Sequence, residues 1–254
     1  MTVNELSRAL DVLIPASLSE EWDHDGRMVV PDGNGEVKKA VIALDATEKA
    51  IGFAASIGAQ AILTHHPLVF HPIDRLDEYD PVAKKAIKCV RNGIAVLSYH
   101  TRLDSLEGGV NDCLAAALGL KDTYAFLPFG RLGNIENETP LEDYVAFCEE
   151  ALGEKCSFAV KGSGKVKRVA IVSGGGKDHL LDACLAGADT FVTGEANHGA
   201  YIAAAEYGIN LVCMTHHATE RVVLPFLAGL VEKASGGTCE TVIFDFDRVR
   251  EYGI

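Results

Sequence analysis

The sequence predicts an α/β protein of two similar βαβ-based lobes with mainly parallel sheets, and three observations support this. Short apolar runs of strand length alternate with longer stretches of helical periodicity, which is typical of βαβ units. The chain has 254 residues, more than one average domain of about 150. Its composition, with 48% hydrophobic and 23% charged residues, is that of a globular protein and excludes wholesale disorder.

The first expected element is a helix at the start of the sequence, where Thr2 and Glu5 match a capping box. Apolar runs then predict strands at residues 40–44, 61–63, 94–97, 169–172, 190–192, 211–214 and 238–244. Helices are expected between them at 47–58, 81–92, 110–118, 141–151, 177–186, 197–207 and 218–234. Several of these helices are followed by glycine, a common residue at helix C-termini: Gly93, Gly119, Gly187 and Gly208.

The strand spacing shows a weak internal repeat. Ile42 and Ile62 are 20 positions apart, as are Ile171 and Phe191, and a glycine precedes the next strand in both halves. Any two βαβ units can look alike in this way, so duplication stays a hypothesis. We expect one family unit, residues 1–254, with approximate lobes 1–125 and 126–254, and a turn-rich connection at about 120–165.

Charge and hydropathy exclude several classes of protein. The chain carries 36 acidic and 23 basic side chains, and a net charge of -13 argues against nucleic acid bound by bulk attraction. The longest apolar run, residues 222–231, is far below the roughly 20 residues that span a bilayer. Seven cysteines lie far apart without a CxxC pair, so reduced, buried thiols are expected. We therefore expect a cytoplasmic protein.

Histidine placement is the most prominent chemical signal in the sequence. Two pairs, His65-His66 and His216-His217, each follow a threonine at the end of an apolar strand, and His100 ends a third strand. Ligands of open parallel sheets bind beyond the carboxyl ends of the strands. The sequence therefore predicts a site at this edge, between the two lobes.

Carboxylates accompany these histidines four residues further on. His216 and Glu220 share one face of an expected helix, and His100 precedes Asp104 by the same interval. In an extended segment the adjacent rings of His65 and His66 point in different directions, toward two different ions.

The candidate ligands are too many for one ion and suit two. They are His65, His66, Asp104, His216 and Glu220, with His100 as a sixth. Imidazole and carboxylate without thiolate fits Zn, Fe, Mn, Ni or Co, so the identity of the metals stays open. Two closely spaced ions need a bridging group, either Glu220 or a shared water.

Other interpretations of these segments stay open. A histidine after a strand is more often structural than a ligand, and this interpretation is retained for His217. The segment SGGGKD, residues 173–178, fits an anion site at a helix start and fits a tight βα turn equally well. Candidate general bases are His100, Glu195 and His198, with Glu195 and His198 serving alternatively as groups that orient ligands or substrate.

Taken together, the motifs THHPLVF (64–70), HTRLD (100–104), VTGEANH (192–198) and THHATER (215–221) resemble those of the GTP cyclohydrolase I type 2 homologue family. EEWDHDG (20–26) is similar to the family's WDNxG segment. The resemblance runs over nearly the whole chain, which is similar in length to the short members without an inserted domain. One departure is Thr215, which stands where the family has glycine.

The resemblance implies two divalent metal ions per chain, with His65, His66, Asp104, His216 and Glu220 as ligands. It also implies a toroidal homohexamer. The implied function is a dinuclear metal-dependent hydrolase that acts on a nucleotide or related heterocycle, with an anionic substrate attacked by a metal-bridging hydroxide. Two alternatives are a phosphoesterase or amidase, and a hexameric metal-binding or regulatory ring without catalysis.

Overall fold

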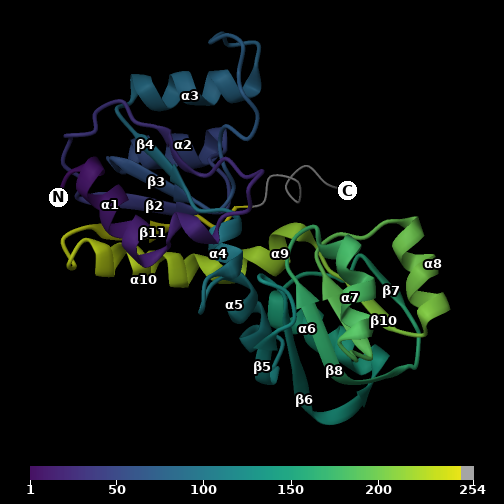
Figure 1. The fold of residues 1–254 in the computed structure, drawn as a ribbon. Helices are drawn as coiled ribbons and strands as arrows, with labels where there is room; N and C mark the ends of the chain where they lie inside the picture. The colour runs from purple at the N-terminus through teal and green to yellow at the C-terminus, as the bar shows by residue number, and fades with distance from the viewer. Residues whose placement is uncertain (247–254) are drawn as a thin grey trace. The chain divides into compact units, whose positions relative to one another are not determined.

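The computed structural model describes residues 1–246 and divides the chain into two compact units (Figure 1). Unit 1 comprises Met1–Leu103 and the described residues from Leu224 to Phe246, and unit 2 comprises Asp104–Val223. The division after Leu103 differs from the expected lobe boundary near residue 125. Unit 2 is thus inserted between two segments of unit 1.

Unit 1 is built on a five-stranded sheet in the order β1-β4-β3-β2-β11. Its strands are β1 (Gly26–Val29), β2 (Lys39–Ala43), β3 (Ala61–Thr64), β4 (Ala95–Ser98) and β11 (Glu240–Ile243). The last four run parallel to one another, and β1 pairs antiparallel with β4 at the edge.

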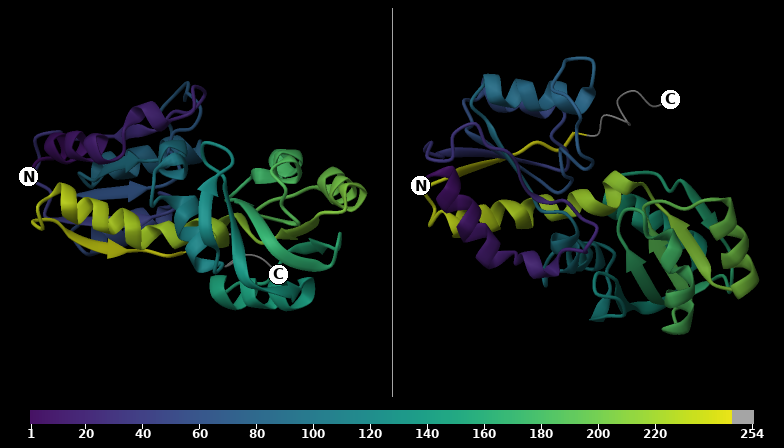
Figure 2. Two further views of the ribbon diagram at one scale, coloured as in Figure 1. Left: turned by 60° about the horizontal axis from the view of Figure 1, so that its bottom comes forward. Right: turned by 45° about the horizontal axis from the view of Figure 1, so that its top comes forward.

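Helices cover both faces of this sheet. They are α1 (Val3–Leu13), α2 (Glu48–Ser56), α3 (Pro81–Arg91) and α10 (Leu224–Ala234), with the 3-10 helix η1 (Ala16–Leu18) after α1. The capping box of Thr2 and Glu5 begins α1, as predicted. Val41, Ile62 and Val96 pack with α2 and α3 on one face, while α1 and α10 pack together on the other (Figure 2, right).

Unit 2 is built on a six-stranded sheet in the order β5-β6-β8-β9-β10-β7. Its strands are β5 (Lys121–Ala125), β6 (Arg131–Pro140), β7 (Phe158–Val160), β8 (Lys165–Val172), β9 (Thr190–Thr193) and β10 (Asn210–Cys213). The central strands β8, β9 and β10 are parallel, whereas β6 and β7 run in the opposite direction. Both sheets thus consist mainly of parallel strands, as predicted.

A hydrophobic core lies on each face of the unit 2 sheet. Its helices are α4 (Thr101–Ser105, across the unit boundary), α5 (Val110–Ala117), α6 (Leu141–Leu152), η2 (Gly176–His179), α7 (Leu180–Leu185), α8 (His198–Tyr207), α9 (His216–Glu220) and η3 (Arg221–Val223). Val169, Ile171 and Val192 pack with α5 and α6 on one face. On the other face, Ala170 and Phe191 pack with α7 and α8.

The internal repeat has a structural counterpart. Val41 of β2 pairs with Ile62 of β3, and Ala170 of β8 pairs with Phe191 of β9, so both pairings have the same sequence separation. The stretch 120–165 is, by contrast, more than a connection. It supplies β5, β6, α6 and β7, because its polar, turn-rich segments form antiparallel edge strands of the second sheet.

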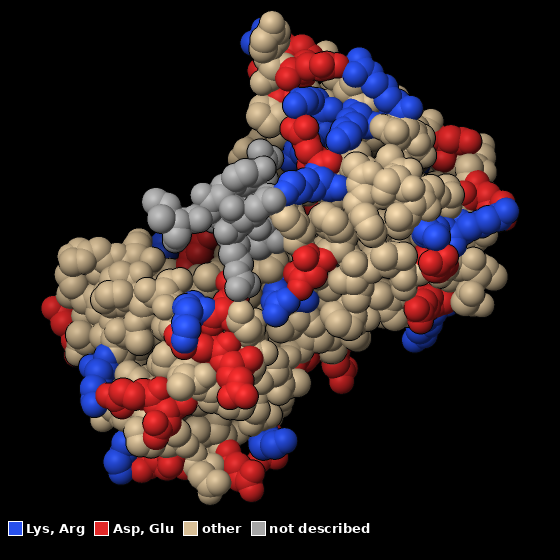
Figure 3. Space-filling model, turned by 180° about the vertical axis from the view of Figure 1, so that it is seen from behind, with Lys and Arg blue, Asp and Glu red and all other residues tan. Residues whose placement is uncertain are grey.

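The cysteines of the chain are free thiols, and charged side chains of both signs lie on its surface. All seven cysteines are free; four of them are buried, as expected, whereas Cys113, Cys156 and Cys184 are only partly buried. In residues 1–246 no helix is both long and apolar enough to cross a membrane. Burial raises the pKa of Cys213, which disfavours a thiolate at the end of β10. On the face drawn in Figure 3, acidic and basic side chains of the described residues are interspersed.

Candidate metal centre

In unit 1, two neighbouring parallel strands end at hydroxyl residues that join them. The hydroxyls of Thr64, at the end of β3, and Ser98, at the end of β4, form a buried hydrogen bond of 2.7 Å. After β3 the chain bends at His65 and His66, and His100 lies two residues after the end of β4. The ligand nitrogens of these three histidines lie within 4.8 Å of one another.

Each of the three rings is oriented by an oxygen at Nδ1. His65 Nδ1 lies 3.1 Å from the carbonyl oxygen of Tyr99. His66 Nδ1 lies 3.1 Å from Asp45 Oδ1, and His100 Nδ1 lies 2.9 Å from Asp23 Oδ1.

A carbonyl oxygen only accepts hydrogen bonds, so Nδ1 of His65 is the protonated nitrogen and Nε2 carries the lone pair of the neutral ring. Carbonyl or carboxylate oxygens orient metal-binding histidines in the same way. The donor set of this cluster therefore fits a divalent metal ion.

Asp23 and Asp25 hold the segment that carries His100. Asp23 accepts hydrogen bonds from the His100 ring and from the Thr101 amide and hydroxyl. Asp25 accepts from the His100 amide at 3.3 Å and from Arg102 Nε at 2.8 Å. Burial alone would raise the pKa of Asp23, but its hydrogen bonds with His100 and Thr101 outweigh this and hold the pKa well below its usual range.

In unit 2, the second cluster lies at the start of α9. His216 and Glu220 share one face of this helix, with 3.1 Å between Nε2 and Oε1. Glu195, just after β9, lies 3.0 Å from Nδ1 of His216 through its Oε1. The His216 ring thus contacts a carboxylate on each side, and the Glu220 side chain is almost fully buried.

Asp104 belongs to the same unit. It lies in α4, and its Oδ1 accepts a long hydrogen bond of 3.4 Å from the hydroxyl of Ser173, just after β8. The ends of β8, β9 and β10 thus lead to Ser173, Glu195 and His216, a hydroxyl, a carboxylate and an imidazole.

The glycine-rich segment after β8 is a tight turn packed against this cluster. The amides of Ser173, Gly174 and Gly176 donate to the side chains of Asn111, Thr219 and Thr193, respectively. Because these amides already have partners in the protein, the structure favours the βα-turn interpretation over an anion site.

His217 occupies a separate environment within the same helix. Its Nδ1 lies 2.9 Å from Glu154 Oε1, and Glu154 Oε2 accepts the hydroxyl of Thr215 at 2.6 Å. Thr215 is also the N-cap of α9, accepting from the Ala218 amide at 3.0 Å. The threonine that departs from the family pattern is therefore used locally, to begin the helix and to hold Glu154.

One expectation about side-chain direction changes. His65 and His66 do not diverge, since their ring centroids are only 4.9 Å apart. The reason is the bend at these residues, which ends the extended backbone on which the expectation depended. His198 is exposed at the first residue of α8, whereas Glu195 contacts His216 directly.

Three acidic residues that contact histidines directly were not predicted from the sequence as part of the site. Asp45 follows β2, and only its place after a strand pointed to it. Asp23 lies in the WDHDG segment, whose similarity to the family motif was its only signal. Glu154 follows α6, and nothing in the local sequence distinguishes it from a surface carboxylate.

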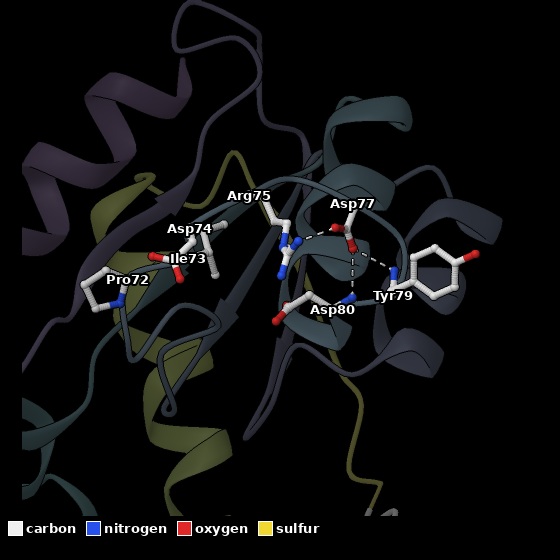
Figure 4. Close-up of a pocket in the computed structure, with 7 residues that line it drawn as sticks. All are labelled: Pro72, Ile73, Asp74, Arg75, Asp77, Tyr79 and Asp80. Atoms are coloured by element: carbon white, nitrogen blue, oxygen red, sulfur yellow. Dashed lines mark hydrogen bonds and ion pairs between the residues drawn. The ribbon is translucent and has the colours of Figure 1, made fainter.

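Open pockets in the described residues include one in each unit. One, of about 450 Å³, is formed by the loop before α3 in unit 1 (Figure 4). In that pocket Arg75 faces Asp77, whereas the fully exposed ring of Tyr79 points away from the other residues. The other, of about 560 Å³ in unit 2, contains the ion pair of Arg131 and Asp112.

The fold and these clusters define an α/β protein of two units, each with histidine and carboxylate groups beyond the carboxyl ends of its parallel strands. Residues 1–248 match the model of the Duf34/NIF3 (NGG1p interacting factor 3) family. The chain therefore belongs to the Duf34/NIF3 family, which confirms the resemblance inferred from its motifs.

Relatives match over nearly the whole chain. A GTP cyclohydrolase 1 type 2 homolog of Clostridium perfringens is 30% identical over 254 residues, 96% of each chain. NIF3-like protein 1 of Drosophila melanogaster is 25% identical over 252 residues, and the match spans 95% of this chain and 85% of the relative.

Solved structures share the complete fold. A Bacillus cereus protein related to NIF3 superimposes with a TM-score of 0.91 at 20% identity, over 98% of both chains. Reduced HcgD from Methanocaldococcus jannaschii superimposes with a TM-score of 0.82 at 27% identity, over 97% of this chain and 98% of HcgD. The fold is thus shared by bacterial and archaeal proteins.

Proposed function

We propose that this protein is a dinuclear metal-dependent hydrolase that acts on a nucleotide or related heterocycle. The observation that carries the proposal is the cluster of His65, His66 and His100, whose ligand nitrogens converge while oxygens orient the rings. The names of the relatives, homologs of a GTP cyclohydrolase, give the substrate class.

The proposed ligands of two divalent ions per chain are His65, His66, Asp104, His216 and Glu220. Their donors are imidazole and carboxylate groups, which suit Zn, Fe, Mn or Ni. In unit 1 the support is the converging histidine cluster, and in unit 2 it is the close pairing of His216 with Glu220. Divalent ions supply a water of lowered pKa and positive charge that stabilises an oxyanion.

Residues of the chain would transfer protons and orient the metal ligands. His100 is the proposed general base, since its Nδ1 is held by Asp23 and its ring lies 5.3 Å from that of His65. Glu195 is proposed to orient His216 through Nδ1. His198 is the alternative base, from its exposed position at the start of α8.

A cytoplasmic homohexamer is proposed for the assembly, as the family resemblance implies. Helix α8 supports this proposal, because its surface is apolar enough to be covered by another subunit. The helix is rich in alanine and aromatic residues, yet only Ala204 is buried. Ile202 and Tyr207 on this helix are about half exposed. Sedimentation velocity measures the mass directly, and a monomer at micromolar concentration would refute the assembly.

Metal content tests the proposed function first. Tag-free protein is chelated, refilled separately with Zn, Fe, Mn or Ni, and analysed for bound metal. About two ions per chain supports the dinuclear site, whereas no tight metal contradicts it. Each metal form is then given GTP: purine ring opening changes the ultraviolet absorbance, and phosphoanhydride cleavage releases phosphate. Tight metal without turnover would favour a non-catalytic metal-binding ring.

A further inference from the structure

Beside the histidine cluster of unit 1 lie two aromatic rings that the proposed chemistry does not use, Trp22 and Phe70, and both contact the ring of His100. Trp22, Phe70 and His100 have pairwise ring-centroid distances of 6.1, 6.1 and 5.9 Å. Their planes cross at 67°, 79° and 87°, so the three rings are nearly perpendicular to one another. We name these residues the aromatic corner.

Trp22 is exposed although its backbone is firmly anchored. Its side chain is 56% exposed, which is unusual for the largest apolar residue. The turn that carries it is fastened at Glu20, whose amide donates to Thr101 Oγ1, and at Asp23, which holds Thr101 and His100. The exposed indole is therefore fixed beside His100 and does not belong to a loose loop.

The chemistry of the corner selects the type of ligand. An exposed indole face offers a large apolar surface to a planar ring, with an expected contribution of about 1–3 kcal/mol for a stacked base. Aromatic corners also attract organic cations. Divalent ions at the neighbouring imidazoles would repel a cation, however, while they favour a neutral ring that carries an anionic group.

We propose that Trp22 binds the planar heteroaromatic ring of the substrate by stacking, with Phe70 as the second wall of the site. This inference rests on the proposed function, to which it adds the residues that hold the aromatic ring of the substrate. His100, the third ring of the corner, also belongs to the histidine cluster, so a ring held by Trp22 lies next to the proposed metal ligands.

The experiment exploits the single tryptophan of the chain, because Trp22 is then the only source of indole fluorescence. The Mn-loaded protein is titrated with GTP, with ribose 5-phosphate and with tetramethylammonium. GTP is expected to quench the fluorescence saturably, while ribose 5-phosphate leaves it nearly unchanged. Quenching by tetramethylammonium alone would identify a cation site and overturn the inference.

Variants distinguish a loss of stacking from a general loss of structure. By calorimetry, Trp22→Ala is expected to weaken GTP binding about 5- to 150-fold, the equivalent of losing one stacked base. Trp22→Phe should restore most of the affinity, and Phe70→Ala should weaken it. The matched control is Tyr79→Ala, which removes an exposed aromatic side chain of the same unit that makes no ring contact in residues 1–246.

Metal content and turnover, measured on the same samples, distinguish the two proposals. Nucleotide binding that depends on Trp22 without turnover would preserve the stacking site and refute the hydrolase. GTP affinity that is equal in Trp22→Ala and wild type, or absence of GTP binding to the metal-loaded protein, would refute the stacking site whatever the metal content.

Discussion

Gly174 and Glu220 are packed so closely that a side chain at residue 174 has no space. A Cβ atom on Gly174 would overlap Oε1 of Glu220 and would lie 3.0 Å from Nε2 of His216. The backbone at Gly174 also has a φ of +56°, which residues with a side chain rarely adopt. The turn after β8 therefore has two requirements for glycine, one conformational and one imposed by the candidate ligands.

Gly174→Ala is expected to lower both stability and metal content. The strained φ alone costs about 1 kcal/mol, and displacement of Glu220 adds to it. Gly208→Ala is the matched control, because Gly208 has a φ of +71° with no atom within 4 Å of an added Cβ. Denaturant unfolding and elemental analysis should show a stability loss in both variants and metal loss only in Gly174→Ala. Equal metal content in the two variants would contradict a role of Glu220 as ligand.

Glu220→Ala and His217→Ala should differ in their effects. Glu220→Ala is expected to lose at least half of the bound metal with the fold intact, since a proposed ligand is removed. His217→Ala should keep its metal but unfold more easily by about 1–3 kcal/mol, because the buried Glu154 loses a hydrogen-bond partner. Elemental analysis and urea unfolding measure the two effects. If both variants lost the same amount of metal, the assignment of Glu220 as a ligand and of His217 as a structural residue would fail.

Metal binding should stabilise the protein in a concentration-dependent way. At a free metal concentration of 100 times Kd, one bound ion adds about 2.7 kcal/mol to the free energy of unfolding. Differential scanning calorimetry of chelated protein with increasing Mn should therefore show a rising Tm. In Glu220→Ala the rise should be smaller, and an unchanged slope in that variant would count against its role.

The ion pair of Asp112 and Arg131 predicts a pH dependence. Burial raises the pKa of Asp112, but hydrogen bonds from Arg131 and the Gly108 amide outweigh this and lower it below 3.8. A carboxyl group with a lowered pKa stabilises the native state above its unfolded pKa and loses this effect as the pH falls through its native pKa. The contribution of Asp112 is thus complete near neutral pH and declines progressively as the pH falls below about 4.

Asp112→Asn tests this dependence. At pH 7 the variant should be less stable than wild type by about 1–3 kcal/mol, since Arg131 is buried and loses its charged partner. The difference should shrink as the pH is lowered below 4, where wild type loses the same interaction. Urea unfolding from pH 7 to pH 3 measures it, and a constant difference over this range would exclude Asp112 as the titrating group.

The sequence predicted seven strands, of which six lie inside the sheets and β11 lies at the edge of the first sheet. β2, β3, β4, β8, β9 and β10 are continuous apolar runs because helices bury both of their faces. The missed strands β1, β5, β6 and β7 run at sheet edges or antiparallel to their neighbours. Every residue of β5 is exposed, so no hydrophobic pattern marked it.

The candidate site was predictable in part for a similar reason. Positions after strand ends pointed to His65, His100 and His216, because local sequence determines where a strand stops. The partners of these rings depend on which segments the fold brings together. Asp23 is 77 positions from His100, and Glu154 is 63 from His217, so only the tertiary structure reveals these pairs.

The return of the chain to unit 1 determines the order in which the units become complete during synthesis. Unit 2 is one continuous segment, Asp104–Val223, and all of its strands leave the ribosome before β11 does. The sheet of unit 1 lacks its edge partner for β2 until Glu240–Ile243 emerges. The inserted unit can therefore fold cotranslationally, while unit 1, whose first strands emerge earlier, is completed after it.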